Sequence, residues 1–153
     1  MTAKRAPGPV EQAVQAELKF RPTNSPDDGG DLTPARELLA TVDQLLDHAS
    51  AGTAGRWPRA AALLTRQALE TALTFFWTKQ APGVEECDFR AQFLCLGRYL
   101  GDEALAQRAH VVWSGLSSAC HHHVYELAPT REELQAWRET VAEVGERTER
   151  AWR

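Results

Sequence analysis

The densest group of polar side chains capable of chemistry lies between Trp113 and Leu127. It consists of three consecutive histidines with serines before them and a tyrosine after them: Ser114, Ser117, His121, His122, His123 and Tyr125. An imidazole exchanges protons near neutral pH, so His121 or His122 is a candidate general base if the chain is an enzyme. Adjacent residues of a helix point about 100° apart, so three neighbouring histidines do not converge on one ion. We therefore expect no metal site and no cofactor.

The helical phase of this stretch gives the three histidines different surroundings. If the helix continues as far as Leu127, His123 shares the apolar face that packs into a bundle, and His122 points to solvent. The polar line beside that face consists of Ser114, Ser117 and His121. Because a buried imidazole needs a hydrogen-bond partner, His123 is interpreted either as a satisfied core residue or as a functional one.

Arg66 and Glu70 are the second pair of residues that could contribute to a site. They are four residues apart, which places them on one face of a helix, where they can form a local ion pair. Glu70 could instead accept a hydrogen bond from a histidine of a later helix and orient it. Both alternatives stay open at the level of sequence.

Five segments carry apolar residues at three- and four-residue intervals and are expected to form the helices that position these side chains. The first runs from an N-cap at Thr33 to the loop at Gly52–Gly55, the second from Pro58 to about Gln80, and the third from Asp88 to Leu100. The fourth runs from a cap at Asp102 toward Leu127, with a break or close packing at Gly115. The fifth runs from a capping box of Thr130 and Glu133 to the end. No segment has the pattern of a strand. The sequence predicts an all-α fold, a four- to five-helix bundle.

Length and composition are those of an ordinary globular chain. The 153 residues are 43% hydrophobic and 25% charged, with a net charge of −4 and both signs spread along the sequence. This balance fits one modest core and argues against a protein that coats nucleic acid along its whole surface. Three cysteines without C-x-x-C spacing favour reduced thiols. No stretch reaches the ~18 consecutive apolar residues of a membrane span, so we expect a cytoplasmic protein without a membrane partner.

The first 31 residues differ in composition from the rest. They contain four prolines and the run Asp27 to Gly30, which favour a flexible tail, interrupted by a helix-capable piece from Val10 to Phe20. The apolar residues of that piece could cap the domain, but a mostly mobile arm is the favoured interpretation. We therefore divide the chain into a flexible tail, residues 1–31, and a helical bundle domain, residues 32–153.

Two segments together resemble a known family. The sequence AALLTRQALE at residues 61–70, followed later by LSSACHH at residues 116–122, is similar to the HEPN family, named for higher eukaryotes and prokaryotes nucleotide-binding. The resemblance covers about residues 33–150. It implies a HEPN-like bundle of four or five helices that dimerises, in a family where many members are metal-independent RNases of toxin or phage-defence systems.

The catalytic signature of that family is only half present. The family has an arginine four to six residues before its histidine, whereas the corresponding positions here are Ser114 to Ser118. Arg108 is about 20 Å from His121 along a continuous helix, too far to substitute on the same segment. Charge on a cleaved phosphate would have to be stabilised by Arg66 or by an arginine of a dimer mate. We therefore expect a non-catalytic member.

Three hypotheses about function follow. The first is a non-catalytic nucleic-acid or partner-protein binding component of a prokaryotic defence or toxin–antitoxin system, whose ligand is RNA, a nucleotide, or a partner such as an antitoxin. The second is a metal-independent RNase that uses His121 or His122, and the third is a helical scaffold with an aromatic-rich interface. A narrow apolar seam on the last helix, formed by Leu134, Trp137, Val141 and Val144, predicts a homodimer.

Overall fold

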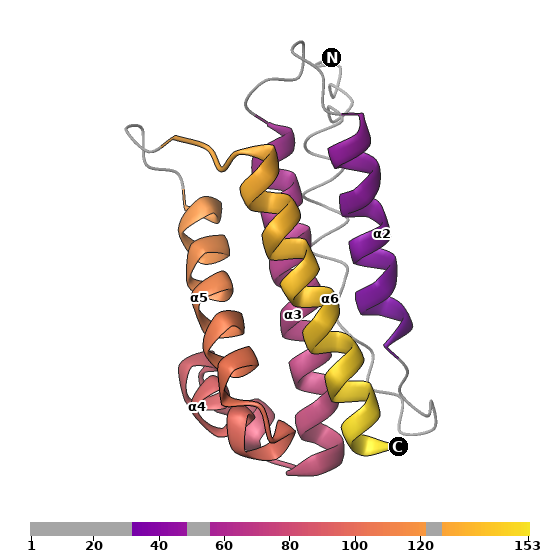
Figure 1. Cartoon of the computed structure of the whole chain (residues 1–153), viewed down its shortest axis with the longest axis vertical. Coiled ribbons are helices and arrows are strands. Elements are labelled where there is room, and N and C mark those ends of the chain that lie inside the picture. The colour runs from indigo at the N-terminus through magenta and orange to yellow at the C-terminus, as the bar shows by residue number, and fades with distance from the viewer. Residues whose placement is uncertain (1–31, 49–55, 122–126) are drawn as a thin grey trace, which may run out of the picture.

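The computed structural model describes residues 32–48, 56–121 and 127–153, and these ranges contain helices and their connections. The elements are α2 (Thr33–Asp47), α3 (Trp57–Gln80), a short 3-10 helix η2 (Val84–Glu86), α4 (Phe89–Leu100), α5 (Glu103–Cys120) and α6 (Arg131–Trp152). No strand occurs in the described ranges, so the predicted all-α bundle is confirmed (Figure 1). The predicted tail, residues 1–31, lies outside the described residues.

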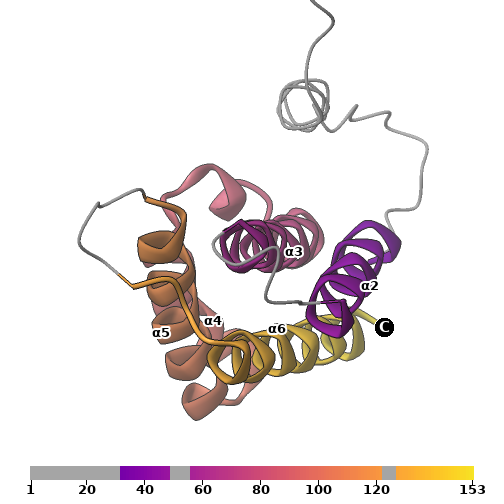
Figure 2. The same ribbon diagram turned by 90° about the horizontal axis from the view of Figure 1, so that it is seen from above.

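Helix α3 is the central element of the bundle. It contacts α2, α5 and α6. Viewed from above, α3 lies between α2 and the α4–α5 pair, and α6 runs along its third side (Figure 2). Its buried residues extend from Pro58 to Trp77, and the large Phe76 and Trp77 side chains are completely buried. A helix that is apolar around much of its circumference must be covered on several sides, which explains this central place.

The predicted signals at the helix ends are confirmed for α4 and α6. The Asp88 carboxylate accepts a hydrogen bond from the backbone N–H of Ala91, and Gly101 ends α4 with a φ of 64° that suits glycine. At α6 the capping box is complete. Thr130 Oγ1 accepts from the N–H of Glu133 at 3.1 Å, and the Glu133 carboxylate accepts from the N–H of Thr130 at 2.8 Å.

Two predicted helix ends are wrong. Helix α2 begins at Thr33 itself, with Leu32 as its N-cap residue, so Thr33 lies inside the first turn. Helix α5 ends at Cys120, where His121 turns to extended backbone with φ −83° and ψ 129°. The expected continuation to Leu127 does not occur, because residues 127–130 are not helical and the Leu127 side chain is 97% exposed. The apolar spacing from Cys120 to Leu127 therefore does not reflect a continuation of α5.

Gly115 marks close packing between helices. Helix α5 runs through it without interruption. A Cβ atom at this position would lie 2.9 Å from Cζ2 of Trp137 on α6, closer than real Cβ contacts. The glycine thus allows the indole ring to pack directly on the α5 backbone, and the alternative of a helix break is wrong.

The apolar seam of α6 faces into the bundle. Leu134 and Val144 are completely buried and Val141 is 2% exposed. The prediction that this seam is left open for a second copy is therefore wrong, because α3 and the other helices of the same chain already cover it. The homodimer itself stays a prediction, without this surface to support it.

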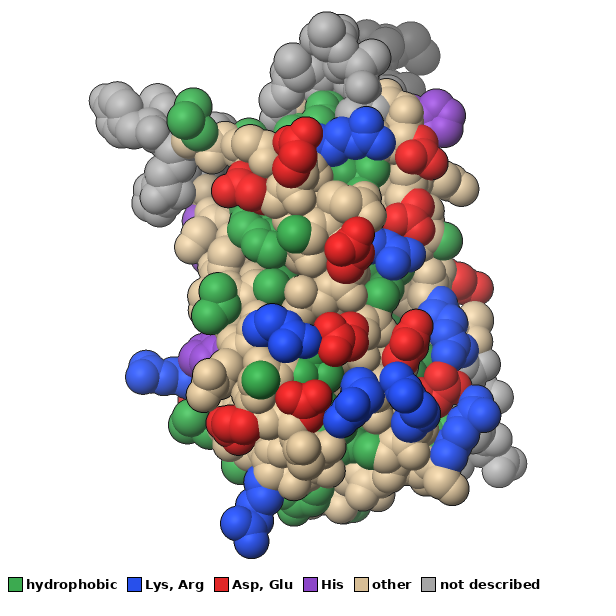
Figure 3. Space-filling model, in the orientation of Figure 1, with side chains coloured by type: hydrophobic (Ala, Val, Ile, Leu, Met, Phe, Trp, Pro, Cys, Tyr) green, Lys and Arg blue, Asp and Glu red, His purple; other side chains and the backbone are tan. Residues whose placement is uncertain are grey.

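Arginine side chains connect the helices on the outer face. Arg138 of α6 binds both carboxylate oxygens of Asp43 on α2 at 2.8 and 2.7 Å, Arg108 of α5 binds Glu143 of α6 at 2.8 Å, and Arg36 of α2 pairs with Glu149 of α6. Acidic and basic side chains alternate over α2 and α6 on this face (Figure 3). An exposed pair such as Arg108–Glu143 contributes little stability, whereas the bidentate geometry of Arg138 on Asp43 is of the kind that contributes more. Their mixture of signs gives this face no large field of one sign.

Candidate functional site

The predicted site residues that the structure describes lie where α3 meets the second half of α5. The two helices contact each other: Glu70 contacts Trp113, and Arg66 contacts Trp113 and Cys120. Arg59 and His121 line the same small pocket. We call these six residues the α3–α5 seam: Arg59, Arg66, Glu70, Trp113, Cys120 and His121. On α3 its members are separated by seven and four residues, which keeps them on one face of the helix.

The best-defined contact of the seam is a three-residue network. Arg66 Nε donates to Glu70 Oε1 at 2.7 Å, and the same oxygen accepts a hydrogen bond from Trp113 Nε1 at 3.0 Å. The Arg66 guanidinium carbon also lies 5.8 Å from the centre of the Trp113 ring, which adds a cation–π contact. The predicted ion pair between Arg66 and Glu70 is therefore confirmed. The partner that Glu70 receives from α5 is an indole, where the sequence had suggested a histidine.

Arg66 holds its positive charge firmly in this setting. Partial burial acts to lower its pKa, but the hydrogen bond and charge of Glu70 and a smaller contribution from the Cys120 side chain outweigh burial. The pKa of Arg66 is therefore raised above its ordinary value. The Arg66 and Glu70 side chains are 28% and 23% exposed, so the ion pair remains within reach of solvent.

Aromatic rings continue the network on the side of α4. The Trp113 ring centre is 5.7 Å from that of Phe89 and 6.0 Å from that of Phe93. The imidazole of His110 stacks on Phe93 at 5.3 Å with an interplanar angle of 16°. Trp113 thus contacts the rings of Phe89 and Phe93 as well as Arg66 and Glu70, while its own side chain is only partly buried.

Arg59 and His121 line the same small pocket at the end of the seam. Both line a small pocket of about 10 Å³ together with residues 118–119 and 127–129. This volume is comparable to that of one water molecule and cannot accept a nucleotide. It nevertheless brings an arginine and a histidine together, although the two are distant in sequence.

The other predicted site residues fall on both sides of the end of α5, with Ser114 and Ser117 inside the helix and His121 beyond it. Ser114 is exposed, whereas the Oγ of Ser117 is buried and has no hydrogen-bond partner in the described structure. His121 is exposed and lies beyond the helix, so the polar line predicted to include it is wrong. His122, His123 and Tyr125 lie outside the described residues. The helical phase used to orient His123 does not apply, because it required a helix that continues past Cys120.

Sequence reasoning missed Arg59, Trp113 and Cys120 as members of the site. A signal for Arg59 was present, since it precedes Arg66 by seven residues and therefore occupies the same face of α3. The contacts of Trp113 and Cys120 depend on the register between α3 and α5, which spacing along one helix does not contain.

In the described ranges, no group of three or more histidine, cysteine, aspartate or glutamate side chains is arranged to hold a metal ion. None of the helices there combines the length and the apolar character needed to cross a membrane. Searches against family models, curated proteins and solved structures find no match to this chain. The resemblance to the HEPN family therefore stays a prediction.

Proposed function

We propose that this protein is a non-catalytic, HEPN-like nucleic-acid-binding component of a prokaryotic defence or toxin–antitoxin system, and that it binds single-stranded RNA along the α3–α5 seam. The nucleic-acid part rests on the chemistry of the seam, and the biological setting rests on the resemblance of residues 61–70 and 116–122.

The observation that carries the proposal is the line of Arg59, Arg66 and Trp113. The two arginines are seven residues apart on α3, which corresponds to about 10 Å along the helix axis. Two guanidinium groups at such a separation can contact two phosphates of one strand, and guanidinium forks suit phosphate oxygens. Trp113 lies beside Arg66 and is only partly buried, so the exposed part of its ring offers an aromatic contact for a base, a kind of contact that is tolerant of sequence.

Single-stranded RNA fits the seam better than a free nucleotide does. A nucleotide needs a concave pocket, whereas the pocket beside His121 has a volume of only about 10 Å³. An extended strand needs only a surface that combines positive charge with a partly exposed aromatic side chain. Acidic and basic side chains are mixed on the outer face of α2 and α6, so we expect only a short stretch of the RNA strand to contact the protein.

A second candidate function is supported by the pocket shared by Arg59 and His121. The family signature needs an arginine near a histidine, and Arg59 would supply from α3 the residue that α5 lacks. In that case His121 would act as the general base of a metal-independent RNase. We rank this function second, because His121 is exposed and no described contact within the seam orients its imidazole ring.

The proposal is tested by titrating the full-length protein into a fluorescently labelled single-stranded RNA of mixed sequence and recording anisotropy. We expect Arg59→Ala and Arg66→Lys each to weaken binding by about tenfold, because loss of a good phosphate contact costs about 1–3 kcal/mol. The matched control is Arg98→Ala, which removes an exposed arginine of α4 outside the seam. Raising the salt concentration should weaken binding by the wild type more steeply than binding by Arg59→Ala.

The same samples separate the other hypotheses. RNA cleavage without added metal, lost in both His121→Ala and Arg59→Ala, would replace binding with catalysis. Absence of RNA binding by the wild type at physiological salt would reject the proposal and leave the scaffold hypothesis, for which Leu94 and Val111 offer exposed apolar side chains.

A further inference from the structure

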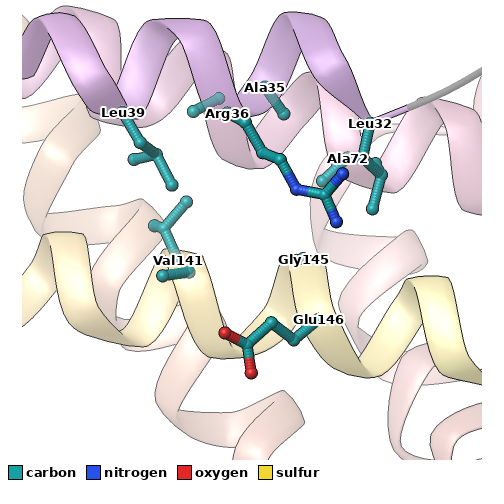
Figure 4. Close-up of a pocket in the computed structure, with 10 residues that line it drawn as sticks. Leu32, Ala35, Arg36, Leu39, Ala72, Val141, Gly145 and Glu146 are labelled. Atoms are coloured by element: carbon teal, nitrogen blue, oxygen red, sulfur yellow. The ribbon is translucent and has the colours of Figure 1, made fainter.

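A second surface, which shares no residue with the α3–α5 seam, is an apolar groove between α2 and α6 with α3 as its floor. Its volume is about 90 Å³, and its lining is mostly small or aliphatic: Leu32, Ala35, Leu39, Ala68, Ala72, Val141, Ala142 and Gly145, with Arg36 and Glu146. Leu39 and Val141 converge at one end, and the Arg36 side chain extends across the space toward Leu32 and Ala72 (Figure 4).

The groove is open because small residues of three helices face one another. A Cβ atom at Gly145 would meet nothing within 4 Å, in contrast to Gly115, where Trp137 fills the space. Protein interiors are normally packed without voids of this size. A cavity of 150 Å³ holds benzene, so 90 Å³ has the size of one aliphatic side chain such as leucine or valine. The groove therefore has the shape of a socket for an apolar side chain supplied from outside the described residues.

We propose that the chain's own segment Val10–Phe20 docks in this groove. The described chain begins at Leu32, which lines the groove and is 3% exposed, so the segment that precedes it is covalently joined to a residue of the groove. Val10, Val14 and Leu18 recur at four-residue intervals, which would place them along one side of a helix.

The length of the connection allows this contact. The linker from Arg21 to Asp31 can span up to about 35 Å when extended. Helix α2, which forms one wall of the groove, has 15 residues and is about 22 Å long, so the linker can reach along the whole groove. A short tether also keeps the segment at an effective concentration of about millimolar. An intramolecular occupant is therefore favoured over a separate helix of the same composition.

Hydrogen–deuterium exchange on the full-length chain tests the docking. In the wild type, we expect the amides of residues 10–20 to exchange at least about tenfold more slowly than in Val14→Asp, which places a charge on the apolar side of the segment. Gln12→Asp is the matched control, because it introduces the same charge on the opposite side and should retain the protection. Gly145→Leu, which fills the groove from α6, should remove the protection while melting curves show a folded bundle.

The possible outcomes each decide the question. Exchange of residues 10–20 at the unprotected rate in the wild type would overturn the proposal, and so would protection that persists in Gly145→Leu. Protection that rises with protein concentration would also overturn it, because the segment would then come from a second copy.

Discussion

The indole Nε1 of Trp113 on α5 donates a 3.0 Å hydrogen bond to the Oε1 of Glu70 on α3. That oxygen also accepts from Arg66, so one carboxylate joins the central helix to α5 and holds both an arginine and an aromatic ring in place. An indole N–H that is partly buried needs such a partner. Glu70 therefore positions Arg66 and Trp113, the two residues that contact the strand in the proposed function.

Removing the Glu70 carboxylate should destabilise the fold. In Glu70→Ala, the Trp113 indole and Arg66 both lose their acceptor, and we expect a decrease of about 1–3 kcal/mol in the free energy of unfolding. Glu70→Gln keeps a carbonyl oxygen for the indole and should lose less. Urea unfolding followed by circular dichroism measures both. Equal losses in the two variants would show that the hydrogen bond to Trp113 contributes nothing.

Two glycines of the bundle should respond in opposite directions to alanine. Gly115→Ala inserts a methyl group 2.9 Å from Trp137, so it should lower the melting temperature although alanine favours helices. Gly145→Ala meets nothing within 4 Å and should stabilise by up to about 1 kcal/mol. Thermal unfolding of the two variants side by side gives the comparison. A stabilised Gly115→Ala would contradict the close packing of α5 on α6.

The capping box at α6 should be measurable by itself. Thr130→Ala removes the hydroxyl that accepts from the Glu133 N–H, with an expected cost of about 1 kcal/mol. Thr130→Ser retains the hydroxyl and should stay close to the wild type. The midpoint of urea unfolding is the readout, and a Thr130→Ser variant as unstable as Thr130→Ala would rule out the hydroxyl as the cause.

His121→Ala should leave stability unchanged within about 0.5 kcal/mol, because the side chain is exposed and lies beyond the end of α5. The same change should weaken RNA binding if His121 belongs to the binding face. A melting curve and an anisotropy titration on one preparation test both statements. A large loss of stability would mean that the imidazole has a structural role.

The fold was predictable from sequence to a considerable extent. Pro58, Asp88, Gly101 and Thr130 act through local backbone chemistry, so their types alone indicated where helices begin or end. The end of α5 was not predictable in the same way. The apolar spacing through Cys120 to Leu127 continued the helical pattern, but spacing does not reveal whether a neighbouring helix covers that face, and the Leu127 side chain is almost fully exposed.

The site was predictable only where it is local. Arg66 and Glu70 lie on one turn of one helix, so their ion pair followed from their separation. The additional bond from Trp113, 43 residues later, depends on how α5 is placed against α3. The pocket that Arg59 and His121 both line depends on the same register.

The most direct measurement of the central claim is photocrosslinking of full-length protein to single-stranded RNA containing 4-thiouridine, followed by mass spectrometry of the crosslinked peptides. If the α3–α5 seam binds RNA, crosslinks should concentrate on the peptide that contains Trp113 and should decrease strongly in Arg66→Lys. Crosslinks confined to peptides of α2 or α6, or unchanged by Arg66→Lys, would contradict the account.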